Sequence, residues 1–390
     1  MHTLPHQPTR QDPHRAARQD PHDPHDPHEP ARQALDQPAG QAEQTSQAPP
    51  RLEPREDALT PGMAPVGFDS NGAATKRRML IIVNPYASTV SDRLRHLVVY
   101  ALQGRFEVDA VDTEARGHAT ELCREAAHEG YDVVVAFGGD GTVNEAANGL
   151  LGSATPLTCL PGGSANVFGK MLGIPGELID ATEHLLALAD DWRPRRVDLG
   201  VVRTERDSSG DVSERCFTFA SGLGVDASVV QQVDANPRRK ARFGAYYFTW
   251  VALHTFARRY LARAPRMEVL SGEDRLAAVT AIVQNGSPFT YFQNRPIEIA
   301  DGTTLDSGAL SGCVLHRATP LAMPSIGLRA FVRSARVSRH RQVTGLPAFT
   351  ELTVRSADER PLPLQVDGDY LGEVSAAHYS IRPGALNVIA

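Results

Sequence analysis

The chain has 390 residues, a formal net charge of −6 and 41% hydrophobic residues. This length allows two or three domains with sizeable cores, and the mild acidity argues against a nucleic-acid partner, because domains that bind nucleic acid are usually basic. The four cysteines, Cys123, Cys159, Cys216 and Cys313, form no Cys-x-x-Cys pair, so neither a zinc site nor a disulfide framework is predicted. We expect buried thiols and, without a signal peptide or an apolar run of membrane-spanning length, a cytoplasmic protein.

Residues 1–75 differ in composition from the rest of the chain. They are rich in Pro, Gln, Asp, Arg and His, and they include the near-repeat from His22 to Pro30. Few large apolar side chains occur, so this segment cannot bury enough surface to offset its ordering entropy. It is predicted to be a disordered tail; weak binding of a transition metal by its His/Asp cluster is the alternative.

Residues 76–195 are predicted to form an α/β domain. Apolar strand-like runs at 79–83, 106–112, 132–136 and 156–160 alternate with segments of helical spacing at 94–102, 117–127 and 177–189, and with a helix after Asn144. Strands that alternate with helices form parallel sheets with right-handed crossovers. In such sheets the ligand binds at the carboxyl ends of the strands.

Four loops that follow these strands carry polar or glycine-rich sequence: Asn84, Thr113, Gly138 to Asn144, and Gly162 to Asn166. We expect them to converge on one crevice. The turn Gly138-Gly139-Asp140-Gly141 allows close backbone approach to a ligand, and helix-start N–H groups favour phosphate, with Thr142 or Asn144 as capping oxygens. A carboxylate facing a polyphosphate needs a cation between them, so Asp140 points to Mg²⁺ and a nucleotide; a tight turn whose Asp caps the helix is the alternative.

Residues 196–390 are predicted to form a β-rich antiparallel domain, a sandwich or a barrel, whose last strand is a candidate for return to the first domain. Short strand-like runs separated by Gly, Pro, Asn and Asp occur at 196–202, 216–220, 267–270, 277–284, 310–316, 349–355, 362–367 and 379–382. Helical insertions are expected from Phe243 onward and at 320–332.

Two carboxylates flank a glycine near the end of the chain, in Asp367-Gly368-Asp369. A carboxylate held beside a nucleotide could accept the proton of an attacking hydroxyl. Taken alone, Asp-Gly-Asp is equally an ordinary hairpin turn. Its combination with the predicted crevice favours the catalytic interpretation.

The chain resembles the diacylglycerol kinase catalytic-domain family, which includes bacterial diacylglycerol kinase-like lipid kinases and sphingosine kinases. The resemblance extends from about Arg78 to the end and includes Val197-Asp198-Leu199-Gly200 beside the motifs above. It implies a nucleotide domain beside a β-rich lipid domain, Mg²⁺ at Asp140, and Asp369 as proton acceptor. The residues that it implies for ATP are Asn84, Thr113, Gly138, Gly139, Asp140, Gly141, Thr142, Val143, Asn144, Gly163, Ser164 and Asn166.

The sequence departs from the family pattern at several positions. Ser88 stands where the first loop usually ends in Gly, and Ser164 replaces the more usual Thr, whose hydroxyl it can match. Val167 stands where many bacterial members have Asp, and Ser307 falls where a ligand of a structural Mg²⁺ would be. Asp306 and Asp198 are the remaining candidates for further metal ligands.

A basic run at 237–242 precedes an aromatic segment with Phe243, Tyr246, Tyr247 and Trp250. Cations next to amphipathic aromatics suit an anionic membrane surface; a core helix with a solvated basic start is the alternative.

We therefore predict an ATP- and Mg²⁺-dependent lipid kinase, peripheral to the membrane, that transfers the γ-phosphate to a lipid hydroxyl such as that of diacylglycerol or a sphingoid base. The alternatives are an enzyme like NAD kinase, which shares the Gly-Gly-Asp-Gly turn, and a non-catalytic lipid- or nucleotide-binding relative. A homodimer is possible.

Overall fold

The structure is a computed structural model, and it describes most of the chain from Lys76 onward. The predicted tail and the basic run at 237–242 lie outside the described residues, as does most of the aromatic segment after it. The described ranges are 76–87, 91–205, 212–236, 247, 250–252, 254–261, 263–292, 294–300, 302–332 and 335–390.

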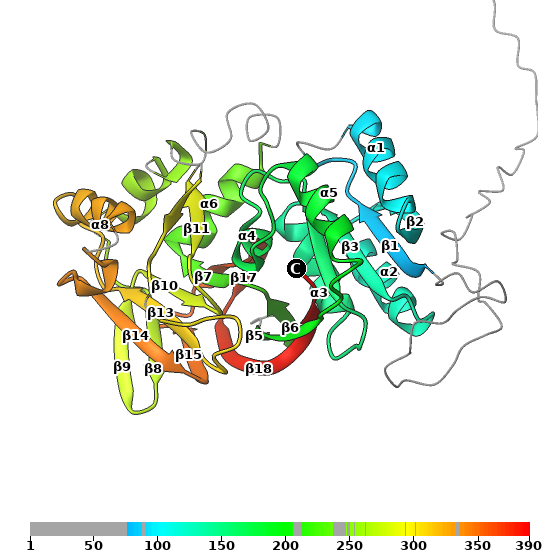
Figure 1. The fold of residues 1–390 in the computed structure, drawn as a ribbon. Coiled ribbons are helices and arrows are strands. Elements are labelled where there is room, and N and C mark those ends of the chain that lie inside the picture. Colours follow the sequence, from blue (N-terminus) through cyan, green and yellow to red (C-terminus); the bar gives the residue numbers. More distant parts are fainter. Residues whose placement is uncertain are drawn as a thin grey trace, which may run out of the picture. The chain divides into compact units, whose positions relative to one another are not determined.

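The N-terminal half of the described chain is a parallel sheet with helices between its strands (Figure 1). Its strand order is β2-β1-β3-β4, and all three strand pairs are parallel. The strands are β1 (Arg77–Val83), β2 (Phe106–Asp112), β3 (Val133–Gly138) and β4 (Leu157–Pro161). The helices are α1 (Asp92–Gln103), α2 (His118–His128), α3 (Asp140–Gly149), α4 (Val167–Leu172) and α5 (Leu178–Ala187).

Burial on both faces explains why β1 and β3 are almost continuous apolar runs. Every residue of β3 is buried, and on α2 the side chains of Ala119, Leu122, Cys123 and Ala126 face the same core. All four cysteines are buried and unpaired, as predicted.

The C-terminal half adds antiparallel strands to the same sheet and builds a second sheet. The first sheet continues through β18 (Ala376–Val388), β15 (Glu351–Ser356), β8 (Met267–Ser271) and β9 (Asp274–Ala278). In the same sheet β5 (Arg195–Glu205) pairs with β18, and β6 (Val212–Phe217) pairs with β5. The second sheet has the order β14 (Val343–Phe349), β13 (Leu310–Leu315), β10 (Thr280–Gln284), β7 (Ala220–Gly224), β16 (Leu362–Val366), β17 (Asp369–Val374). β11 (Thr290–Phe292) and β12 (Arg295–Ile297) form a separate hairpin.

Apolar side chains from both sheets form one core, in which the rings of Phe217 and Tyr379 meet edge to face at 6.1 Å. Further helical elements are α6 (Val225–Asp234), η1 (Phe256–Tyr260), α8 (Ala322–Phe331) and η2 (Val337–Arg339). The predicted fold class, an α/β part followed by an antiparallel sandwich, is confirmed. Val388, at the end of β18, pairs in parallel with Leu157 of β4.

Three of the predicted strands are interrupted in the structure, and one of them, the run 349–355, divides at Thr350 between β14 and β15. The run 216–220 bends at Thr218 and Phe219, between β6 and β7, because the N–H groups of both residues donate to the Asp367 carboxylate. The run 277–284 divides at Val279, where the chain passes from the first sheet into the second. The short α4 and the longer α6 were not predicted, and α3 begins at Asp140, so Thr142 and Asn144 lie inside it and do not cap it.

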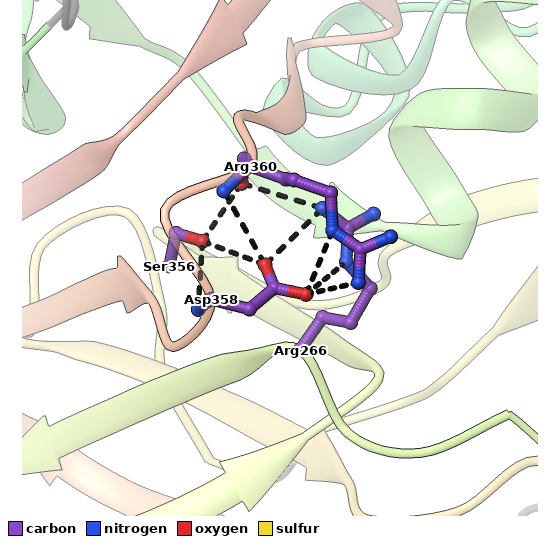
Figure 2. A network of polar contacts seen from close by, with 4 residues as sticks. All are labelled: Arg266, Ser356, Asp358 and Arg360. Atoms are coloured by element: carbon purple, nitrogen blue, oxygen red, sulfur yellow. Dashed lines mark hydrogen bonds and ion pairs between the residues drawn. The ribbon is translucent and has the colours of Figure 1, made fainter.

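A polar network orders the turn between β15 and β16 (Figure 2). Arg266 donates from Nε to Asp358 Oδ2 at 3.0 Å, and Arg360 donates to the same carboxylate. Ser356 donates from its hydroxyl to the carbonyl of Arg360 at 2.7 Å. The hydrogen bond from Arg266 holds the pKa of Asp358 well below its usual range. The network lies at the start of the strand β16, which leads to Asp367.

The two glycine turns pack backbone against backbone at the ends of β3 and β4. Gly162 N donates to Gly138 O at 2.9 Å. A Cβ atom added to Gly163 would lie 2.7 Å from Gly139 Cα, and one on Gly162 would lie 2.7 Å from Gly138 Cα. The close approach of the two loops therefore requires glycine at these positions.

We predict that Gly163→Ala destabilises the fold by about 1–3 kcal/mol, because the added methyl group has to push the two turns apart. Gly176→Ala is the matched control, since its added Cβ would have only Lys170 Cε nearby, at an ordinary 3.5 Å. Urea unfolding of both variants measures the difference in the free energy of unfolding. Equal effects of the two substitutions would contradict the packing argument.

Candidate active site

A cavity of about 370 Å³ opens where the ends of β1 and β2, the start of α3 and the start of β17 meet. Of the predicted nucleotide residues, Asn84, Thr113, Gly141 and Thr142 line it, and so does the predicted base Asp369. The cavity therefore brings three of the predicted loops together with a carboxylate that is more than 200 residues away in the sequence. The other lining residues are Tyr86, Glu114, Ala115, Arg116 and Glu145.

Asn84 connects the end of β1 to the glycine turn. Its Nδ2 donates to Thr142 Oγ1 at 3.1 Å, and its Oδ1 accepts from the backbone N–H of Tyr86 at 2.9 Å. Both ends of the amide are thus used to hold the first turn of α3 against the loop after β1.

The loop between β2 and α2 is held by Glu145, which sequence reasoning did not place in the site. Glu145 Oε1 accepts from Gly117 N at 2.9 Å, and Thr120 Oγ1 donates to the Glu145 carbonyl, also at 2.9 Å. His118 adds a third contact, since its Nδ1 accepts from Glu114 N at 3.0 Å. The Asn-Glu pair after the glycine turn is the signal that could have identified Glu145.

Asp369 lies directly against the glycine turn. A Cβ atom added to Gly141 would lie 2.9 Å from Asp369 Oδ2. The guanidinium of Arg116 lies 3.8 Å from Asp369 Oδ1, and the Asp369 side chain is 29% exposed. One carboxylate oxygen thus lies against the turn while Arg116 approaches the other.

Asp367 has a different environment, although only Gly368 separates it from Asp369. It is buried, and its Oδ2 accepts from Thr218 N at 2.7 Å, from Thr218 Oγ1 at 2.8 Å and from Asn144 Nδ2 at 2.8 Å. Its Oδ1 accepts from Phe219 N and Ala220 N, both at 3.0 Å. Burial raises the pKa of Asp367, and these donors oppose that shift because they stabilise the charged form.

Asn144 does not line this cavity. It is 2% exposed, and besides Asp367 its Nδ2 donates to the Cys216 carbonyl at 2.9 Å, while its Oδ1 accepts from Arg215 Nε at 2.9 Å. The amide therefore links α3 to β6 and to the turn before β17.

Asp140 lies in a small hollow that it shares with the predicted residues Gly138, Val143 and Asn166 and with Lys170. The half-buried carboxylate accepts from Phe168 N at 3.3 Å, so it contacts the start of α4 instead of capping α3. Burial raises the pKa of Asp140 to about 7, and the N–H groups of Phe168 and Val167 act in the opposite direction.

Two hydrogen bonds between Gly163 and Asn166 hold the turn after β4. Gly163 N donates to Asn166 Oδ1 at 2.9 Å, and Asn166 Nδ2 donates back to Gly163 O at 2.8 Å. Ser164 is exposed between them.

The carboxylates predicted for metal do not gather in one place: no group of three or more His, Cys, Asp or Glu suited to a metal ion occurs among the described residues. Asp198 is buried and accepts from Gly308 N at 2.6 Å and from Gly384 N at 2.8 Å. Asp306 is exposed and accepts from Thr304 Oγ1 at 2.7 Å.

Asp226 at the start of α6 supports the turn that carries Asp369. Gln365 Nε2 donates to Asp226 Oδ2 at 2.6 Å, and Gln365 Oε1 accepts from Gly368 N at 2.9 Å. Burial raises the pKa of Asp226 to about 6, against the effect of the Gln365 hydrogen bond. No sequence motif marks Asp226, because its contact depends on the pairing of β7 with β16.

Two regions of the chain match models of protein families. Residues 78–202 match the diacylglycerol kinase catalytic domain, and residues 220–390 match the YegS C-terminal NAD kinase beta sandwich-like domain. Diacylglycerol kinases from Staphylococcus aureus strains JH9 and Newman are each 33% identical over 129 residues, which is 32% of this chain and 40% of the length of each relative.

The solved structures agree in fold. A diacylglycerol kinase from Bacillus anthracis strain Sterne aligns with a TM-score of 0.55 at 20% identity, covering 80% of this chain and 96% of that chain. Another solved chain from the same strain reaches a TM-score of 0.59 at 21% identity, with the same coverage. The two matched regions span both halves of the described structure, so the chain consists of a diacylglycerol kinase-like catalytic domain followed by a YegS-like, NAD kinase-like C-terminal domain.

Proposed function

We propose that this chain is an ATP- and Mg²⁺-dependent lipid kinase that transfers the γ-phosphate of ATP to a lipid hydroxyl, such as that of diacylglycerol or a sphingoid base. The observation that carries the proposal is the position of Asp369, which lines the same cavity as Asn84, Thr113 and the turn at Gly141. A carboxylate and a glycine turn that face each other are the two parts that phosphoryl transfer requires from a protein: a proton acceptor and a phosphate cradle.

In the proposed reaction the lipid hydroxyl lies between Asp369 and the γ-phosphate. The hydroxyl proton passes to an Asp369 carboxylate oxygen, the hydroxyl oxygen forms a bond to phosphorus, and the bond between that phosphorus and the leaving oxygen of ADP breaks. Arg116, near Asp369 and 70% exposed, supplies positive charge at the mouth of the cavity. Asn84 and Glu145 keep the two adjoining loops in place.

Asp140 is the residue that fits Mg²⁺. Mg²⁺ keeps several waters and commonly binds through one or two carboxylates together with substrate phosphates, so a single carboxylate at the glycine turn is sufficient. Burial without a cation raises its pKa to about 7, which a divalent cation would reverse by stabilising the ionised form. When bound, the ion would neutralise charge on the phosphates.

The test is transfer of labelled γ-phosphate from ATP, with Mg²⁺ or with EDTA, to a mixed lipid extract and separately to NAD. We expect label in an organic-phase product only with Mg²⁺, and the product identifies the lipid. Label in NAD would favour an enzyme like NAD kinase, to which the C-terminal match is also related. ATP binding without any product would favour a non-catalytic relative.

Asp369→Asn should lower kcat by about a hundredfold or more, because the amide cannot accept the hydroxyl proton. ATP affinity and the melting temperature should stay near those of the wild type, since Asp369 lies at a half-buried position. Steady-state kinetics and ATP titration measure the two effects. Unchanged turnover would remove Asp369 from the mechanism.

Asp367→Asn is the matched comparison two residues away. The Asn amide would place N–H donors opposite the donors of Thr218, Phe219, Ala220 or Asn144. The variant should therefore lose about 1–3 kcal/mol of folding free energy. The backbone does not cause this loss, because Asn tolerates the φ of 47° observed at Asp367. Thermal unfolding separates this structural defect from the catalytic one.

Asp140→Asn should change the pH dependence of stability. The folded pKa of about 7 lies above the ordinary Asp value of 3.8, so the contribution of neutral Asp140 is fully present below pH 3.8 and is lost as the pH rises through 7. The wild type should therefore lose stability relative to the variant between about pH 5 and about pH 8. Melting temperatures at both values test this, and Mg²⁺ added at the higher pH should stabilise the wild type more than the variant. Parallel curves for the two proteins would contradict the assignment.

A further inference from the structure

The outward face of α8 and its flanking residues is apolar (α8 is orange in Figure 1). Leu321 is 93% exposed, Leu328 67% and Phe331 51%, and Val332 is exposed as well. The other exposed residues between 321 and 332 are Pro324, Ser325 and Gly327, so no charged residue in this span is fully exposed. Surface helices normally turn charged residues toward water.

The fold does not require these side chains for its core. The opposite face of α8, with Met323, Ile326 and Ala330, packs on the apolar cluster of Val279, Ile282, Cys313, Leu315, Ala318, Val337 and Val343. Of the outward residues, Phe331 has an aromatic neighbour, because its ring meets Phe292 edge to face at 5.7 Å. Leu321 and Leu328 project from a helix that is already anchored by its other side.

The sequence segment that contains α8 has arginines but no acidic residues. No Asp or Glu occurs from Ser307 to Thr350, although the whole chain has 46 acidic residues. Within the same span the arginines that the structure describes as exposed are Arg317, Arg336, Arg339 and Arg341. The apolar face thus lies in a segment with a strong local cationic bias in an otherwise acidic protein.

We propose that α8, with Leu321, Leu328 and the adjacent arginines, docks this protein on an anionic lipid bilayer. Apolar side chains would enter the boundary between headgroups and acyl chains, while the arginines contact lipid phosphates. A second copy of the chain is a poorer occupant, because a two-fold interface through this face would bring the arginines of both copies together. The inference rests on the proposed function, since a kinase for a membrane lipid has to reach its substrate in the bilayer.

The test is co-sedimentation of the full chain with vesicles of phosphatidylcholine alone and of an equimolar mixture with phosphatidylglycerol. We expect binding to the anionic vesicles that weakens with salt. The double variant Leu321→Asn, Leu328→Asn should bind them roughly tenfold more weakly. Ile179→Asn on α5 is the matched control, since Ile179 is 69% exposed and lies outside this segment. All substituted side chains are exposed, and melting temperatures verify that the variants fold.

The same variants separate this inference from the proposed function. If lipid is phosphorylated, the double variant should keep its turnover on a short-chain diacylglycerol dispersed in water and lose it on vesicle-borne lipid. Vesicle binding that depends on Leu321 and Leu328 would support the docking surface even if no lipid were phosphorylated. Equal vesicle binding by the double variant and the wild type would overturn the docking surface. A dimer that the substitutions dissociate without changing vesicle binding would also overturn it.

Discussion

The buried carboxylate of Asp367 is the interaction on which the arrangement of the site depends. It accepts hydrogen bonds from the bend between β6 and β7 and from Asn144 of α3, so one side chain joins three segments that are far apart in the sequence. Removing one partner of such a network leaves donors buried without acceptors, which costs more than the bond itself contributed. The position of the turn from Asp367 to Asp369 relative to α3 is therefore set by a polar contact inside the fold.

This constraint gives the two carboxylates of Asp-Gly-Asp different chemistry. Asp367 has all its acceptor capacity engaged by protein donors, whereas Asp369 reaches a cavity that contains Thr113, Thr142 and Gly141. Gln365 also holds the turn, because its side chain accepts from Gly368 N and donates to Asp226. A proton acceptor has to reach its substrate, and the hydrogen bonds of Asp367 hold the turn so that Asp369 lies at the cavity.

Sequence patterns predicted the elements whose determinants are local. The Val-rich run of β3 and the helical spacing on α2 depend on near neighbours, and both elements appear where the periodicity places them. The bend at Thr218 could not be predicted, because the acceptor that causes it lies 149 residues further along the chain. The same holds for Asn144: its motif marks a nucleotide loop, while its contacts with Cys216 and Asp367 exist only after β6 and the turn before β17 have assembled.

Val167, where the sequence departs from the family pattern, bears on the ionisation of Asp140. Val167 places no carboxylate beside Asp140, and Asp140 accepts a hydrogen bond from the backbone N–H of Phe168 at the start of α4. Such donors favour an ionised carboxylate, but burial outweighs them and the pKa of Asp140 stays near 7. A second carboxylate nearby would raise that pKa further through like-charge repulsion, so its replacement by Val makes Asp140 easier to ionise near neutral pH. Under the proposed function, one ionisable carboxylate at the glycine turn is then enough to hold a cation that arrives with the nucleotide, without a cluster of acidic ligands prepared in advance.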